Sequence, residues 1–116
     1  MRRAKETVSM TTLNEALDLM MTRFNPAKAK GVNAVIQLNA TGDDGGQYFT
    51  TVAEGKATLT TGVAPNPTVT INVAAKDWIE IMGGKLDPTR AFMAGKLRIS
   101  GDMGLMMRFQ SMFANS

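Results

Sequence analysis

The spacing of apolar residues changes along the chain, and each spacing predicts an element. Residues 13–24 place their apolar side chains within an arc of roughly 140° at 100° per residue, which predicts a surface helix that the threonines at 11–12 can cap. A short helical turn follows Pro26. From 34 to 40 the apolar residues alternate with polar ones, so a half-buried strand is expected there.

The same alternation predicts four further strands, at residues 47–54, 56–61, 68–73 and 96–100. Glycine-rich connections join the first three strands of the chain, which is typical of successive antiparallel hairpins. The loop at 62–67 contains two prolines and is too long for a tight hairpin. The chain is therefore expected to cross there to another edge of the sheet.

The polar positions of these strands carry many threonines and amides, among them Gln37, Thr50 and Thr51, which predicts one face of the sheet in contact with water. Antiparallel sheets commonly tolerate a solvated face, whereas parallel sheets are covered on both. All helices should then pack on the other face. We therefore predict a two-layer α+β fold: a helix, three strands, a crossover, then strand, helices, strand and helix, with a five-stranded, largely antiparallel sheet.

Three more helical segments are expected, beginning near residues 75, 88 and 103. The first should point Trp78 inward and Asp77 outward, and its cap is weak because Ala74 stands where Ser, Thr or Asp is preferred. Asp87 and Asp102 are suitable caps for the other two.

The last helix has more apolar surface than a small core needs. An arc of about 120°, enough to cover a sheet, holds Leu105, Met106, Phe109, Met112 and Phe113. Met103 and Met107 lie beyond this arc and widen it to roughly 220°. Methionine adapts to irregular surfaces and to ligands of varied shape. A methionine stripe is also typical of an ordinary core, so both interpretations stay open.

Composition places the chain among ordinary soluble domains. Its 116 residues are 44% hydrophobic and 20% charged, which suits one domain over residues 11–116 after a flexible basic tail at 1–10. No run approaches the length of a membrane span, and no apolar segment follows the basic start as in a secretory signal. We therefore expect a cytoplasmic protein.

The net charge of +3 favours anionic partners weakly. Within residues 85–116 the only acidic residues are Asp87 and Asp102, against the cations Lys85, Arg90, Lys96, Arg98 and Arg108. These cations form either a solvated face or a surface that attracts anionic lipid headgroups. Nucleic-acid binding is not expected, because the chain lacks a dense basic helix and its few aromatic residues look buried.

Catalysis is not expected. The chain has no histidine and no cysteine, which removes the commonest general base and the usual thiolate and zinc ligands. Asp43 and Asp44 lie in a glycine-rich turn without the spaced oxygen ligands of a calcium site. No enzyme activity, metal or cofactor is therefore predicted.

The segment from residue 78 to 103 resembles the sterol carrier protein type-two domain, also called the non-specific lipid-transfer domain. The resemblance rests on Gly-Lys-Leu-Asp-Pro at 84–88, on Ala-Phe-Met-Ala-Gly-Lys-Leu at 91–97 and on Gly-Asp at 101–102. It implies a hydrophobic tunnel between sheet and helices that accepts fatty acids, fatty acyl-CoA, sterols or phospholipids.

Carried onto this sequence, the resemblance implies that matching segments line the tunnel with Trp78, Ile81, Met82, Phe92, Met93, Leu97, Leu105, Met106, Phe109 and Met112. The first helix adds the candidates Leu17, Met20, Met21 and Phe24. The leading hypothesis is non-catalytic binding or transfer of one lipid, with transient contact to an anionic membrane surface. The alternative is a homodimeric interaction module of the same fold without a physiological lipid.

Overall fold

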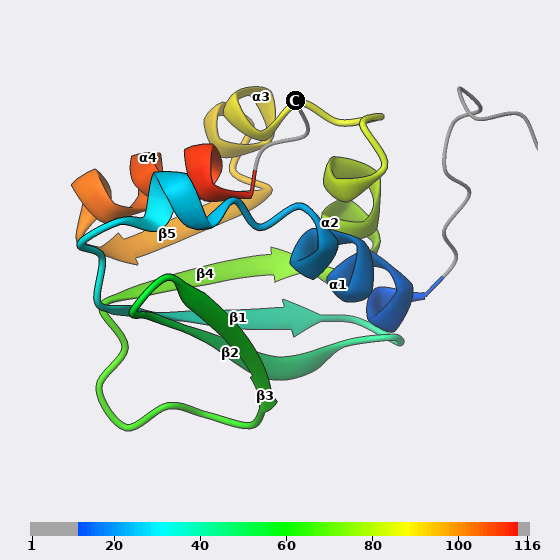
Figure 1. The fold of residues 1–116 in the computed structure, drawn as a ribbon. Helices are drawn as coiled ribbons and strands as arrows, with labels where there is room; N and C mark the ends of the chain where they lie inside the picture. Colours follow the sequence, from blue (N-terminus) through cyan, green and yellow to red (C-terminus); the bar gives the residue numbers. More distant parts are fainter. Residues whose placement is uncertain (1–11, 114–116) are drawn as a thin grey trace, which may run out of the picture.

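A computed structural model describes residues 12–113 and shows one sheet with all helices on one of its faces (Figure 1). The strands are β1 (Ala34–Thr41), β2 (Gly46–Ala53), β3 (Lys56–Thr61), β4 (Val69–Ala74) and β5 (Leu97–Gly101). The helices are α1 (Leu13–Thr22), the 3-10 helix η1 (Pro26–Ala29), α2 (Ala75–Met82), α3 (Pro88–Met93) and α4 (Met103–Met112). The predicted two-layer α+β fold is confirmed; the basic tail at 1–10 lies outside the described residues.

The strand order is β3-β2-β1-β4-β5, and only the β1–β4 pair is parallel. Two residues with left-handed backbone, Glu54 and Gly55 (φ 53° and 74°), make the tight turn between β2 and β3. The predicted crossover then occurs: residues 62–68 return beneath the sheet to the other side of β1 (Figure 1). Because the chain returns to the end where β1 begins, β4 runs parallel to β1.

The outer face of the sheet is not wholly solvated, and the prediction is wrong at Gln37, which is only 2% exposed. Its Oε1 accepts a hydrogen bond from the backbone N–H of Ala64 (2.8 Å), and its Nε2 donates to the carbonyl oxygen of Gly62 (3.2 Å). The crossover loop therefore covers this part of the face, and the amide of Gln37 holds its middle, while hydrogen bonds of Gly62 and Thr68 attach its two ends to β2 and β1.

Two other side chains are more buried than expected. Thr50 is 3% exposed and lies opposite Ile36 on the inward face of the sheet, so it does not belong to the wet face. Asp77 is 8% exposed in the first turn of α2, because α1 packs against this helix. A carboxylate in a first turn is favoured by the helix dipole, which helps to offset its burial.

Of the predicted caps, Thr12, Asp87 and Asp102 are present, and Thr11 lies outside the described residues. Thr12 and Glu15 form a reciprocal capping box at the start of α1, while Asp87 and Asp102 accept hydrogen bonds from the first turns of α3 and α4. Ala74 offers no side-chain bond to α2, as expected. Among residues 12–113, no helix is long and apolar enough to span a bilayer.

We predict that Gln37→Leu lowers the free energy of unfolding by about 1–3 kcal/mol, because the buried N–H of Ala64 loses its acceptor. Urea denaturation measures the change. Gln47→Leu, on the exposed end of the neighbouring strand, is the control and should stay within about 0.5 kcal/mol. Equal effects of the two substitutions would show that Gln37 does not hold the loop.

Candidate functional site

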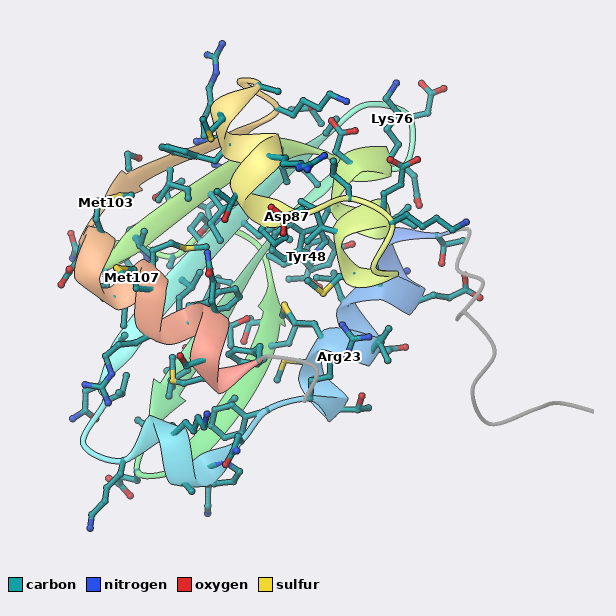
Figure 2. The ribbon with its side chains drawn as sticks, turned by 90° about the horizontal axis from the view of Figure 1, so that it is seen from above. Arg23, Tyr48, Lys76, Asp87, Met103 and Met107 are labelled. Atoms are coloured by element: carbon teal, nitrogen blue, oxygen red, sulfur yellow. The ribbon has the colours of Figure 1, made fainter. Side chains whose placement is uncertain are left out.

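The helices over the sheet fall into two groups, and a cavity lies between them. α1 packs on α2, whereas α4 packs on η1 and β4, and α3 packs on β5. Seen from above, α4 runs along one side of the helical layer, with α1 and α2 on the other (Figure 2). The seam between α2 and α4 holds a cavity of about 350 Å³, which we call the α2–α4 cavity.

The walls of the α2–α4 cavity come from α2 and its following turn, from α4, and from single residues of α1, α3 and β5. They are Arg23, Trp78, Ile81, Met82, Gly83, Gly84, Pro88, Leu97, Met106, Phe109, Gln110 and Phe113. Most of these side chains are apolar, and the volume is that of a small-ligand pocket. An apolar chain can therefore be accommodated without unfolding the layer.

A second space, the outer hollow, continues this cavity toward the surface. It measures about 120 Å³ and lies between α3, β5 and α4. The two spaces have in common Pro88, Leu97, Met106 and Gln110. This shared wall makes them neighbouring parts of one groove along α4.

Directly above the strands the packing is nearly closed. An inner void of only about 10 Å³ remains there, lined by Leu17, Met20, Ile36, Leu38, Thr50, Leu59, Ile71, Trp78 and Phe109. Trp78 and Phe109 line both this void and the α2–α4 cavity, so they form the partition between them. The free volume thus lies between helices rather than along the whole sheet.

Aromatic contacts close one end of the cavity. The ring of Phe113 lies 5.2 Å from that of Phe24 and 4.8 Å from that of Phe109, measured between centroids. The backbone N–H of Asn25 donates to the carbonyl oxygen of Met112 at 2.7 Å. These contacts tie the end of α4 to the segment after α1.

Two polar side chains reach the groove from its rim, and one polar group lies deep within it. Arg23, the C-cap of α1, and Gln110 of α4 line the α2–α4 cavity, and Figure 2 shows Arg23 on the α1 side. The indole Nε1 of Trp78 is buried and has no hydrogen-bond partner within residues 12–113.

Within residues 12–113, no group of three or more acidic, histidine or cysteine side chains could hold a metal ion.

The structure brings together six of the predicted lining residues in the α2–α4 cavity: Trp78, Ile81, Met82, Leu97, Met106 and Phe109. Phe92 lines the outer hollow, and Leu17 and Met20 line the inner void. Met21 and Phe24 are half-buried against the core, whereas Met112 is fully buried and Met93 is 81% exposed.

Leu105 lines a different space, an open surface depression of about 380 Å³ on the other side of α4. Its other walls include the polar residues Asn33, Thr68, Asp102 and Arg108. This mixture suits a hydrated surface better than an apolar ligand.

Several cavity residues were missed from the sequence: Arg23, Gly83, Gly84, Pro88, Gln110 and Phe113. Phe113 was within the predicted apolar arc of the last helix, so its periodicity could have identified it. The glycines and Pro88 contribute through the backbone course between α2 and α3, which side-chain periodicity does not report.

Four large apolar side chains of α3 and α4 are exposed, and all but Met93 line the outer hollow. Phe92 and Met103 are each 47% exposed, and Met107 and Met93 are 73% and 81% exposed. Met103 and Met107 are the two residues predicted to lie outside the core arc, and they project from α4 (Figure 2). We call Phe92, Met93, Met103 and Met107 the apolar rim.

Comparison with known proteins agrees with this architecture. Residues 13–114 match the model of the SCP-2 sterol transfer family. The chain belongs to this family. Its members are lipid-binding domains, and the resemblance seen in the sequence is confirmed.

Hydroxysteroid dehydrogenase-like protein 2 of Danio rerio is 30% identical over 108 residues, which cover 92% of this chain and 26% of that protein. The Xenopus tropicalis protein of the same name is 30% identical over 99 residues. The chain therefore spans about a quarter of the length of these relatives.

Solved structures show the same fold. Palmitated SCP2L2 from Aedes aegypti is 25% identical, with a TM-score of 0.72 over 90% of this chain and 96% of that one. The sec-alkylsulfatase Pisa1 from Pseudomonas sp. is 22% identical, with a TM-score of 0.75 over 91% of this chain and only 17% of that one. This fold thus occurs both alone and within a longer enzyme chain.

We predict that the same substitution at two adjacent methionines of α4 changes the free energy of unfolding by different amounts. Met106→Gln should cost about 1–3 kcal/mol of unfolding free energy, because Met106 is 4% exposed and the amide would be buried among apolar walls. Met107→Gln should stay within about 0.5 kcal/mol, because that side chain is 73% exposed. Thermal or urea denaturation distinguishes them; a large loss at Met107 would place it in the core.

Proposed function

We propose that this domain binds one hydrophobic ligand in the α2–α4 cavity and carries it without chemical change. The observation that supports this most is the apolar cavity of about 350 Å³ enclosed by methionine and aromatic side chains. A fatty acid, fatty acyl-CoA, sterol or phospholipid chain suits these walls. Since the chain has no histidine or cysteine, binding is better supported than catalysis.

The apolar part of such a ligand supplies most of the affinity. Burial of ten acyl methylenes contributes roughly 8 kcal/mol before the cost of association, at about 0.8 kcal/mol each. One cation near an anionic headgroup contributes only about 1 kcal/mol. Arg23 at the cavity wall would therefore orient a charged head, while the apolar walls hold the chain.

The apolar rim offers a route between the cavity and a membrane. Three of its four residues, Phe92, Met103 and Met107, line the outer hollow. The exposed cations Arg90 and Lys96 lie on and just after α3. Exposed apolar side chains beside cations suit a transient contact with an anionic lipid surface. A cytoplasmic location stays a prediction.

Lipid extraction and native mass spectrometry of the purified 116-residue chain test the proposed function. A bound lipid, or displacement of a fluorescent fatty acid by added lipid, is expected. If neither is observed after delipidation and reloading, the proposal fails.

We predict that Met82→Trp weakens fatty-acid binding about 5- to 150-fold without lowering the melting temperature. The indole would occupy part of the cavity that Met82 lines, and a ligand would have to displace it at a cost of about 1–3 kcal/mol. Val63→Trp adds the same bulk at a residue that is 61% exposed in the crossover loop, and it should leave binding unchanged. Equal binding by both variants would place the ligand elsewhere.

The exposed rim also favours a second candidate, a homodimeric interaction module without a physiological lipid. Four large apolar side chains on neighbouring elements are an unusual cluster for a monomer surface. Analytical ultracentrifugation of delipidated protein discriminates: a mass that rises toward the dimer with concentration supports this candidate. A monomer at all concentrations, with lipid bound, supports the first.

A further inference from the structure

Among residues 12–113, the indole N–H of Trp78 is the one buried side-chain polar group without a hydrogen-bond partner. Trp78 is 2% exposed, and its Nε1 is covered on all sides without a hydrogen-bond partner within residues 12–113. An indole nitrogen can only donate, and buried tryptophans usually find an acceptor. A buried donor left unpaired destabilises the ligand-free protein, so a specific acceptor from outside would be favoured.

The position of the ring shows where such an acceptor must come from. Trp78 lines both the α2–α4 cavity and the inner void, while its Nε1 is itself covered. These two spaces are the free volume next to the ring, so we expect a ligand atom to approach the indole from one of them, with a small shift of the side chains that cover Nε1. Thr50, the polar residue of the inward sheet face, lines the inner void beside it.

We propose that Trp78 Nε1 donates a hydrogen bond to an uncharged oxygen atom at the buried end of the bound lipid. This inference rests on the proposed function and narrows its ligand class to lipids with a hydroxyl, ketone or ester oxygen at the end that enters first. Trp78 then acts as a specificity determinant as well as an apolar wall.

On the side of the inner void, the uncharged walls disfavour a buried carboxylate beside the indole. None of the described residues that line the inner void is charged, and Trp78 and Thr50 are its polar members apart from backbone. One indole donor cannot compensate for burying an unpaired carboxylate, whereas it can satisfy a neutral oxygen. A fatty acid would instead point its charged head toward Arg23 at the rim.

A single water molecule is the competing acceptor. The inner void of about 10 Å³ is at the lower limit for one water, which also needs two or more polar partners. Such a water would satisfy the indole before any ligand arrives. The two cases differ in whether the indole signal changes on binding.

Nuclear magnetic resonance of the full chain, labelled with nitrogen-15, tests the inference directly. Trp78 is the only tryptophan, so the spectrum has one indole N–H resonance. We expect a downfield shift of its proton on addition of 2-dodecanone, and a much smaller change with dodecane of equal length. Identical responses to ketone and alkane, or no response because a water already occupies the site, would overturn the inference.

The substitution Trp78→Phe tests the contribution of the indole N–H alone. Trp78→Phe keeps an aromatic wall and removes the N–H, so it should lower the ratio of ketone affinity to alkane affinity about threefold to tenfold. Phe109→Leu changes the other residue that lines both spaces and removes no polar atom, so this ratio should stay constant. Palmitate affinity should fall with Trp78→Phe no more than alkane affinity does.

The outcomes separate this inference from the proposed function. If ketone, alkane and palmitate all bind but the ratio is the same in Trp78→Phe and the parent chain, the inference fails and the proposed function stands. If none of the three binds, both fail. Should Trp78→Phe not fold, the resonance shift in the parent chain still decides.

Discussion

The structure depends on how short helices cover one face of a five-stranded sheet. Burial of that face supplies the main driving force for folding. The helices do not form one continuous layer, because α3 packs on β5 while the other helices pack in pairs. α1 with α2 and α4 with η1 form two separate groups, and the seam between α2 and α4 stays open as the α2–α4 cavity. The same packing that closes the core over β1 and β4 therefore leaves room at β5.

The side chains differ in kind between the closed core and the open seam. Over the strands, rigid branched residues such as Ile36, Ile71 and Leu17 leave only the small inner void. The walls of the α2–α4 cavity include two methionines and three aromatic rings, and the hydrogen bond between Asn25 and Met112 ties one end of α4 to the segment after α1. Flexible thioethers can adjust to a guest while the sheet keeps its register, so ligand binding need not disturb the core.

Much of the fold could be predicted from the sequence because its local signals agree with one another. Alternation defined the strands, Asp87 and Asp102 marked two helix starts, and the loop at 62–67 indicated the crossover. Gln37 and Asp77 were wrongly placed at the surface, since their burial comes from a loop and a helix distant in the sequence. Periodicity alone cannot show such tertiary cover.

The candidate site was predictable only in part. The apolar stripe of α4 and the motif after Trp78 located the correct elements, but not which side chains meet across the seam. Met112 packs entirely inside and Met93 faces solvent, although both lie in segments that match the family. The unpaired N–H of Trp78 has no signature in the sequence, because satisfaction of a buried donor depends on the three-dimensional neighbours.

The central claim is that the guest lies between α2 and α4. Isotope-filtered nuclear Overhauser contacts between carbon-13-labelled palmitate and the protein methyl groups test this most directly. Contacts to the methyls of Ile81, Met82 and Met106 are predicted, with none to Val63 in the crossover loop. Contacts confined to the outer face of the sheet, or to the apolar rim alone, would contradict the account.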